Sequence, residues 1–289
     1  MFPEIIPVRT VREAIDGFVE SLVMNYADNL EALSQPILQV LVWLERLLRM
    51  SPWWAAVMAV MLIAWLASRR VVLSLSMGAL LCIIGVLGLW DAGMQTLALM
   101  IMAVGLSVLI GIPLGVMMGR INGLRAVMLP VLDVMQIMPS FVYLIPVVML
   151  FGLGKIPAII VTVIYAVPPL SRLTDLGIRL VDQEVLEAAR AFGANPRQQL
   201  FGVQLPLALP NIMAGINQST MMGLSMVVIA SMIGARGLGY KVLLGINRQE
   251  AGRGFLAGLA IVVLAILSKI FSRFSALGPR NGWRTRNKG

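Results

Sequence analysis

The sequence predicts an all-α integral membrane protein with about seven transmembrane helices, and three observations support this fold class. Of the 289 residues, 59% are apolar and only 13% are charged, whereas ordinary soluble domains carry ~25% charged residues. Several apolar runs approach the roughly 20 residues that an α-helix needs to cross ~30 Å of hydrocarbon. Strand-like alternation of polar and apolar residues is missing from the sequence, so helices must satisfy the backbone hydrogen bonds.

The seven predicted spans follow one another along the chain. Their approximate limits are 53–68, 71–89, 92–118, 127–153, 156–171, 209–235 and 255–272. Residues 1–52 are too charged to span and lack the basic, then apolar, start of a signal peptide. We therefore expect an extracytoplasmic segment at 1–52, a transmembrane domain at 53–275 and a basic cytoplasmic tail at 276–289.

Lys and Arg orient these spans, because cytoplasmic segments of membrane proteins carry the excess of basic residues. Of the 23 basic residues, 14 lie in 69–70, 120–125, 172–208 and 269–289. All four segments are cytoplasmic if the polar loop 172–208 is, which places the N-terminus outside and the C-terminus inside. The net charge of +9 then reflects topology and not nucleic-acid binding, since the basic residues are scattered at span ends.

Residue types that serve metal sites and acid–base chemistry are scarce. Cys82 is the single cysteine and lies in the second span, and the chain has no His. We expect no disulfide, no metal site and no His-based catalysis.

The segment 30–50 is amphipathic, with apolar residues at helical spacing and Glu45 and Arg46 beside the apolar face. Two interpretations fit equally well. The helix could lie in the outer membrane interface, or it could pack as part of an ordinary N-terminal cap.

Glycines and prolines mark the third to fifth spans. Gly111, Gly115 and Gly119 lie four residues apart on one face of the third span, which lets another helix approach closely. The following spans contain Pro130, Pro139, Pro146, Pro157, Pro168 and Pro169. Each proline removes a backbone donor and can kink a helix, and irregular helices at membrane depth are tolerated where they face protein or a water-filled path.

Polar side chains in the fourth and sixth spans mark a candidate translocation route, because exposing them to lipid is costly. On the fourth span, one face carries Asp133, Gln136 and Ser140. The inner half of the sixth span carries Asn211, Asn217, Gln218, Ser219 and Thr220. Aromatic residues that could offer a π-face to a cation are Phe141, Tyr143 and Tyr165, although aromatics in membrane helices also serve packing and interface anchoring.

Asp133 has two interpretations. It could belong to the route, or it could be a structural acid near the cytoplasmic N-terminus of its helix, where the helix dipole favours a negative charge.

The most organised polar segment, EVLEAARAFGANPRQQLFGVQLPLALP at 184–210, predicts a helix–turn–helix. Glu184 suits the start of the first helix, and Gly193 suits a left-handed cap at its end. One side of this helix carries Val185, Ala188, Ala189 and Phe192. Asn195 and Pro196 suit the start of a second helix, which LPLALP is expected to break before the next span. The segment is expected to project into the cytoplasm as a knob.

This segment resembles the EAA loop of binding-protein-dependent ABC transporter permeases, whose pattern is Glu-Ala-Ala, three residues, Gly, nine residues, Ile-x-Leu-Pro. The matching residues are Glu187, Ala188, Ala189, Gly193, Leu205 and Pro206, with Val203 in place of Ile. The flanking text LDVMQIMPSFVYLIPVVMLFGLGKIPAIIVTVIYAVPPLSRLTD and MVVIASMIGARGLGYKVLLGINR resembles more narrowly the permeases of quaternary amine importers of the glycine betaine/proline type. The resemblance covers roughly residues 40–275.

The resemblance implies a type I ABC importer permease bundle, MetI-like, in a bacterial cytoplasmic membrane. In such permeases the loop forms a coupling helix that docks on a dimer of cytoplasmic ATPase subunits, which bind ATP–Mg, so this chain needs no cofactor of its own. The glycine-rich GARGLGYK at 234–241 has Tyr240 where a Walker A sequence has Lys. The expected partners are therefore the ATPase, an extracytoplasmic solute-binding protein that 236–254 would face, and a second copy of this chain.

The implied solute is a quaternary amine or compatible solute such as glycine betaine, proline betaine, choline, carnitine or proline. The rival hypothesis is a secondary transporter or channel without ATP. Such a protein would need a group of ion-coupling or proton-relay residues within its spans, and Asp133 is the single carboxylate that the sequence places well within a span. A membrane scaffold is a second rival, against which the kinked, polar fourth and sixth spans argue.

Overall fold

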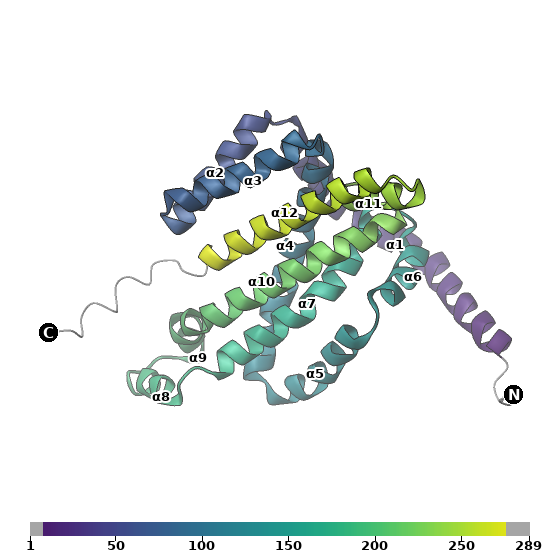
Figure 1. Ribbon diagram of the computed structural model, residues 1–289. Helices are drawn as coiled ribbons and strands as arrows, with labels where there is room; N and C mark the ends of the chain where they lie inside the picture. Colours follow the sequence, from purple (N-terminus) through teal and green to yellow (C-terminus); the bar gives the residue numbers. More distant parts are fainter. Residues whose placement is uncertain (1–7, 276–289) are drawn as a thin grey trace, which may run out of the picture.

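The computed structural model describes residues 8–275, so the predicted basic tail at 276–289 lies outside the described part (Figure 1). The regular elements in the described range are all helical. The main α-helices are α1 Val8–Met50, α2 Trp53–Ser68, α3 Val71–Val86, α4 Trp90–Arg120, α5 Asn122–Ile137, α6 Ser140–Phe151, α7 Lys155–Arg179, α10 Leu205–Ala230 and α12 Ala251–Ser275. The short ones are α8 Gln183–Ala191, α9 Pro196–Gln199, the π-helix η1 Leu200–Gln204, the 3-10 helix η2 Ser231–Ile233 and α11 Leu238–Asn247.

Each of the seven predicted spans coincides with a helix or a bent helix pair. Within residues 8–275, four helices are long and apolar enough to cross a membrane: α4, α7, the helix running from Pro196 to Ile233, and α12. Two bent pairs, the end of α1 with α2 and α5 with α6, bring the number to six, and α3 is a shorter apolar helix. The all-α membrane fold is confirmed, and the two bent pairs turn by 108° and 97°.

The centre of the bundle is formed by α4, α7 and α10, which lie side by side in Figure 1. The predicted glycine row of α4 is the contact with α7. A Cβ at Gly111 would meet Leu170 at 3.0 Å, and a Cβ at Gly119 would meet Ile178 at 2.8 Å. The Ser171 hydroxyl donates to the Gly111 carbonyl at 3.1 Å. The close helix approach that the sequence predicts is therefore confirmed, and α7 is the partner.

The helices α2 and α3 form a hairpin that packs with α12 on one side of this centre. Arg69 turns the chain between them with a left-handed φ of 55°, and its guanidinium lies 5.8 Å from the Trp65 ring centroid. At 16 residues each, both helices are about 24 Å long, which is short for a perpendicular crossing.

The end of α1 packs on the bundle through the apolar face predicted from 30–50. Leu41 is 1% exposed in the core formed with α4, α6 and α7. Glu45 is also buried, and it accepts a hydrogen bond from the Lys155 ammonium at the start of α7. The second of the two interpretations, a packing helix, therefore describes this end of α1, while a position in the membrane interface stays a prediction.

The fourth predicted span, 127–153, is broken. The helices α5 and α6 meet at an angle of 97°, and the break falls at Met138 and Pro139, both with extended ψ. Pro139 lacks a backbone N–H and disfavours helical geometry in the residue before it, which explains the break. The single face predicted for Asp133, Gln136 and Ser140 is therefore wrong, because Ser140 opens the next helix.

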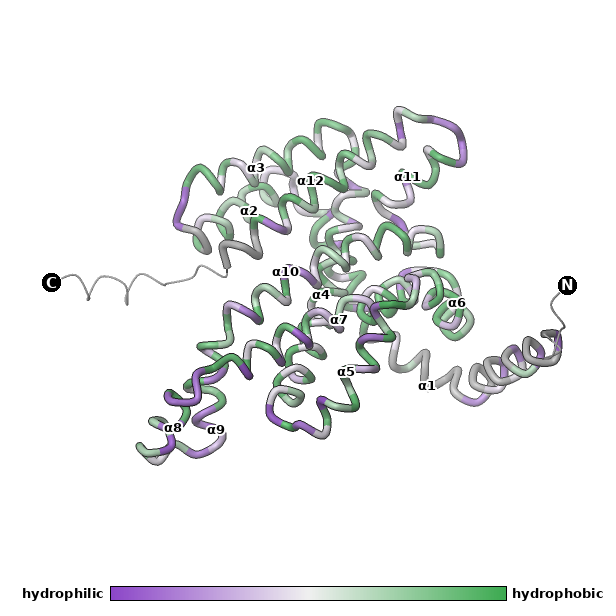
Figure 2. The backbone as a smooth tube through the Cα atoms, turned by 60° about the horizontal axis from the view of Figure 1, so that its bottom comes forward, coloured by the Kyte–Doolittle hydropathy of each residue, from purple (hydrophilic) through white to green (hydrophobic). Residues whose placement is uncertain are grey.

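The two ends of the bundle are polar and its middle is apolar (Figure 2). Hydrophilic residues gather at α8 and α9, at the connection between α4 and α5, and at the connection between α11 and α12. The α8–α9 end extends beyond the apolar helices in both views (Figures 1 and 2).

Candidate functional site

The polar knob at 182–199 is built as the sequence predicts. The Asp182 side chain caps α8 by accepting from the Glu184 backbone N–H at 2.9 Å. At the other end Gly193 has a φ of +80° and donates its N–H to the Arg190 carbonyl at 2.8 Å. Ala194 N–H then closes on the Ala189 carbonyl at 3.0 Å. This left-handed cap strongly favours glycine at position 193.

A capping box starts the second short helix. The Asn195 side chain accepts from the Arg197 and Gln198 backbone N–H groups at 3.0 and 2.9 Å, and the Gln198 side chain accepts from the Asn195 N–H at 2.8 Å. Pro196 occupies the first turn, where no N–H is needed. The predicted cap and first helical position are both confirmed.

Gln199 fastens the two helices of the knob and was not recognised from the sequence. It is buried, its amide donates to the Ala194 carbonyl at 2.8 Å, and its side-chain oxygen accepts from Arg190 Nε at 3.4 Å. Arg190 therefore contacts Gln199 across the turn, in place of the pairing with Glu187 that spacing along the helix suggests. A buried glutamine leaves no distinctive pattern in a polar segment.

The outer face of the knob is apolar although it lies at the polar end of the molecule. Phe192 is 93% exposed and Val185 is 42% exposed, and Ala188 lies exposed between them on α8. Leu186 points the other way and is buried. A fully exposed aromatic beside small residues is typical of the core of a protein interface.

The last two residues of the EAA pattern lie apart from the knob, at the base of α10. Leu205 begins α10, and Pro206 occupies its first turn. The expected break at LPLALP is wrong, because 196–233 continues as one helix. The π-helix at 200–204 explains the continuity: its wide turn, closed by Leu205 N–H on the Leu200 carbonyl, fits just before Pro206, which can neither donate to the preceding turn nor fit tightly against it. The second short helix of the knob is thus continuous with α10.

The residues predicted for the translocation route are spread over three helices. Asp133 of α5 forms an ion pair with Arg172 of α7. It lies near the C-terminal end of α5, which begins at Asn122, so the interpretation of Asp133 as an acid at a helix N-terminus is wrong. Its partner Arg172 lies within α7, which continues to Arg179. The first part of the predicted loop 172–208 is therefore helical.

The α5–α6 elbow is held by one of these residues. The Tyr143 hydroxyl donates to the Met135 carbonyl at 2.7 Å, so α6 is tied back to α5 across the break. Phe141 is 52% exposed on the first turn of α6, and Gln136 is half-buried before the break.

The polar group of α10 divides into two sets. Ser219 is fully buried and donates to the Ala166 carbonyl of α7, and Thr220 donates to the Ile216 carbonyl of its own helix at 2.6 Å. Gln218 is exposed and Asn217 is half-buried. Ser219 and Thr220 therefore serve packing, and Asn217, Gln218 and the half-buried Asn211 stay candidates for the route.

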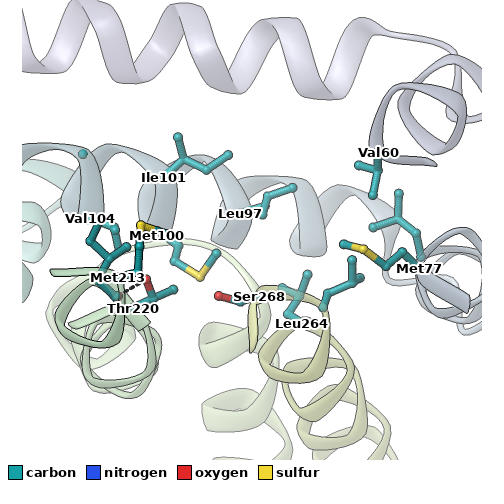
Figure 3. Close-up of a pocket in the computed structure, with 14 residues that line it drawn as sticks. Val60, Met77, Leu97, Met100, Ile101, Val104, Met213, Thr220, Leu264 and Ser268 are labelled. Carbon is teal, nitrogen blue, oxygen red and sulfur yellow. Dashed lines mark hydrogen bonds between the residues drawn. The ribbon is translucent and has the colours of Figure 1, made fainter. Parts of the chain in front are cut away.

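The cavity of about 390 Å³ between α2–α3, α4, α10 and α12 is not this route (Figure 3). Its lining is almost entirely apolar, and the polar side chains at its edge are Thr220 and Ser268. Of the residues predicted for the route, Thr220 alone lines it. A passage for a polar solute would need convergent polar groups.

A buried ion cluster at the knob end of α7 was not recognised from the sequence. Asp175 is 3% exposed and accepts from Arg125 Nε and from Arg179 Nε, each at 3.0 Å. The i, i+4 spacing of Asp175 and Arg179 was visible, but the partner on α5 could not be inferred from spacing.

The opposite end of the bundle carries a basic segment. Arg236, Lys241 and Arg248 are exposed at and around α11, whereas Arg253 pairs with Glu250 at 2.7 Å. Gly237, with a φ of +144°, lets the chain pass close to Thr96, whose hydroxyl accepts from the Leu238 N–H at 2.8 Å.

An apolar helix bundle whose polar end carries a capped, outward-facing helix–turn–helix is the arrangement that the EAA-loop resemblance implies for the membrane-spanning permease subunit of an ABC importer. Residues 111–278 match the family described as the binding-protein-dependent transport system inner membrane component, and the chain belongs to this family.

Curated relatives agree with this assignment, and a solved structure agrees with the fold. ProW of Escherichia coli, a glycine betaine/proline betaine transport system permease protein, is 45% identical over 257 residues, which cover 89% of this chain and 71% of ProW. GbuB of Listeria monocytogenes, a glycine betaine/carnitine transport permease protein, is 50% identical over 190 residues, which cover 64% of this chain and 67% of GbuB. A chain of the inward-facing MetNI methionine ABC transporter matches with a TM-score of 0.59 and 22% identity, covering 65% of this chain and 94% of that chain. The last likeness supports the predicted MetI-like fold.

Proposed function

We propose that this chain is one half of a homodimeric permease that imports a quaternary amine such as glycine betaine, proline betaine or choline, driven by a separate ATPase. The identity of 45% to ProW over 257 residues carries this proposal. The apolar outer face of the knob supports the ATPase partner, because Phe192 and Val185 would otherwise stay exposed to water.

The knob supplies the mechanical link. ATP–Mg binds in the partner ATPase, and closure of two ATPase subunits would move α8. Because 196–233 is one continuous helix, displacement of the knob would be carried along α10 into the membrane. The side of the bundle reached by solute would then alternate between outward and inward.

The solute would pass beside the α5–α6 elbow and α10. Gln136, Asn217 and Gln218 would supply polar contacts there. The exposed ring of Phe141 and the tethered ring of Tyr143 would offer π-faces to a quaternary ammonium group. The wall is shared with a second copy in this proposal, which would cover apolar residues that α5 leaves exposed, including Val134 and Ile137.

The extracytoplasmic binding protein would deliver solute to the end formed by α11. The positive-inside rule disfavours basic residues there, so Arg236, Lys241 and Arg248 need another role. Contact with an acidic rim of the binding protein would give them one.

Reconstitution tests this function directly. The chain, its ATPase and its binding protein are placed in liposomes, and uptake of labelled glycine betaine and choline is measured with ATP or a non-hydrolysable analogue. We expect uptake only with ATP and binding protein together. Uptake that follows an ion gradient without ATP would instead support the secondary transporter.

A further inference from the structure

We propose that Asp175 is a positioning residue for transport: it ties α5 to the end of α7, so that movement of the knob reaches the α5–α6 elbow. This inference rests on the proposed function, because it assigns a role within the ATP-driven cycle. Asp175 contacts no solute in this proposal and acts through the two arginines that it holds.

Asp175 joins two helices through one buried carboxylate. Its Oδ2 accepts from Arg125 Nε of α5 and its Oδ1 accepts from Arg179 Nε of α7, each at 3.0 Å. The Asp175 side chain is 5% exposed, whereas the side chains of Arg125 and Arg179 are 40% and 31% exposed. A carboxylate shielded from water and shared by two guanidinium groups holds both in fixed directions.

Arg179 extends the tie to the connection between α4 and α5. Its Nη2 donates to the Met118 carbonyl at 3.1 Å and to the Asn122 side-chain oxygen at 2.7 Å. Arg179 is also the last residue of α7, and the knob opens at Asp182. The cluster therefore lies between the knob and the beginning of α5, where a push on the knob would reach α7 and α5 in addition to α10.

Apolar packing of α5 within this chain is sparse, which makes these polar ties its main attachment. Leu132 is its one buried residue, and Val127, Val131 and Val134 are 46–61% exposed. A second tie, between Asp133 of α5 and Arg172 of α7, holds the other end of α5. With a tie near each end, α5 would follow α7 as a rigid body and carry the elbow with it.

The charge at Asp175 has no evident advantage for stability alone. A buried ion pair gains little over a well-packed apolar pair, because both charges must leave water. Directional bonds between separate helices do provide defined relative positions, which a device that transmits movement requires.

The experiment compares Asp175→Asn with Asp91→Asn in the reconstituted complex of permease, ATPase and binding protein. Asp91 forms an exposed ion pair with Arg49 at 3.3 Å at the opposite end of α4, so it is a matched control for losing a carboxylate. The readout is solute transported per ATP hydrolysed, measured on equal amounts of assembled complex. We expect Asp175→Asn to lower this ratio by about fivefold or more, a typical coupling effect, while Asp91→Asn leaves it unchanged.

Arg125→Gln decides the question if Asp175→Asn does not assemble, because it removes the tie to α5 and leaves Asp175 paired with Arg179. The double variant Asp175→Asn/Arg125→Gln should transport no less solute per ATP than the more affected single variant, since both single changes break the same link between α5 and α7. A variant that lowers only the yield of complex while keeping the wild-type ratio would show a structural role and overturn the proposal. Absence of ATP-dependent uptake in the wild-type complex would instead overturn the proposed function itself.

Discussion

Gly115 of α4 lies directly against Thr174 of α7, with no room for a side chain between them. A Cβ on Gly115 would lie 2.5 Å from the Thr174 Cβ and 2.5 Å from the Ser171 carbonyl oxygen. The second of these neighbours is backbone and cannot move aside as a flexible side chain could. The contact between the two central helices therefore depends on the absence of a side chain at position 115.

Substitution at this contact should destabilise the bundle. For Gly115→Ala we expect a loss of about 1–3 kcal/mol of stability from overpacking, seen as a lower midpoint of thermal unfolding in detergent. Gly105→Ala is the control, because Gly105 lies on the same helix and a Cβ there would meet nothing within 4 Å in the described structure. A midpoint for Gly115→Ala equal to that of Gly105→Ala would contradict the close contact.

The topology predicts that 1–52 is extracytoplasmic and that the chain after Lys269 is cytoplasmic. We expect a cysteine at position 20 to react with an impermeant thiol reagent in intact cells, and a cysteine at position 285 to react only after lysis. Cys82 is replaced by Ser in both variants to remove the native thiol. The reverse labelling pattern would invert the orientation.

The route along the α5–α6 elbow and α10 makes a prediction for two polar residues. Gln136→Leu and Asn217→Leu should each reduce uptake in liposomes, because a polar solute would meet an apolar wall, while dimer assembly stays intact. Leu109→Ala, at a 70% exposed position of α4, serves as a control outside the route. If both variants transport at wild-type rates, these residues belong to helix packing.

Local signals in the sequence predicted much of the fold because they act over one or two helical turns. The glycine row of α4 needs only its own spacing to be recognised, and Gly193 and Asn195 mark helix ends by their own backbone preferences. The EAA pattern located the knob for the same reason, since its residues are close in the chain.

Features that depend on two distant segments could not be predicted in this way. Arg125 and Asp175 are 50 residues apart, and no periodicity relates them. Asp133 was placed near a helix start because its helix was read as beginning at about 127, whereas α5 begins at Asn122. The helix that is expected to stop at LPLALP continues, because a π-turn compensates for Pro206. The helix propensities of single residues do not predict such a turn.

The exposed ring of Phe192 should dominate binding of the ATPase. Aromatic residues at the centre of an interface often cost ≥2 kcal/mol when truncated, so we expect Phe192→Ala to weaken the complex by about 30-fold. At 93% exposure its removal should not alter folding. Phe255→Ala, 75% exposed at the opposite end of the bundle, is the control, and pull-down of the ATPase with purified permease gives the comparison. Equal binding by both variants would place the docking surface elsewhere.

Gly193 should be the position of the knob that is most sensitive to substitution. The cause is either its backbone conformation or its contact with the ATPase, and a pair of variants separates these two causes. Its φ of +80° penalises any side chain by about 1 kcal/mol, and a Cβ there meets nothing within 4 Å in the isolated chain. Asn tolerates the left-handed conformation better than Ala. If the backbone alone matters, Gly193→Asn should keep most of the activity that Gly193→Ala loses.

If Gly193 instead lies against the ATPase, Gly193→Asn and Gly193→Asp should both insert and dimerise but lose uptake stimulated by the binding protein, as should Ala188→Trp on the same surface. Gly202→Ala is the control, since Gly202 lies outside the left-handed cap and also has no atom within 4 Å of its Cβ position. The measurements are ATPase binding, ATP hydrolysis and uptake for each complex. Normal transport by both Gly193→Asp and Ala188→Trp would remove the coupling role from the knob, because a charged group and a large ring cannot both fit a closely packed docking surface.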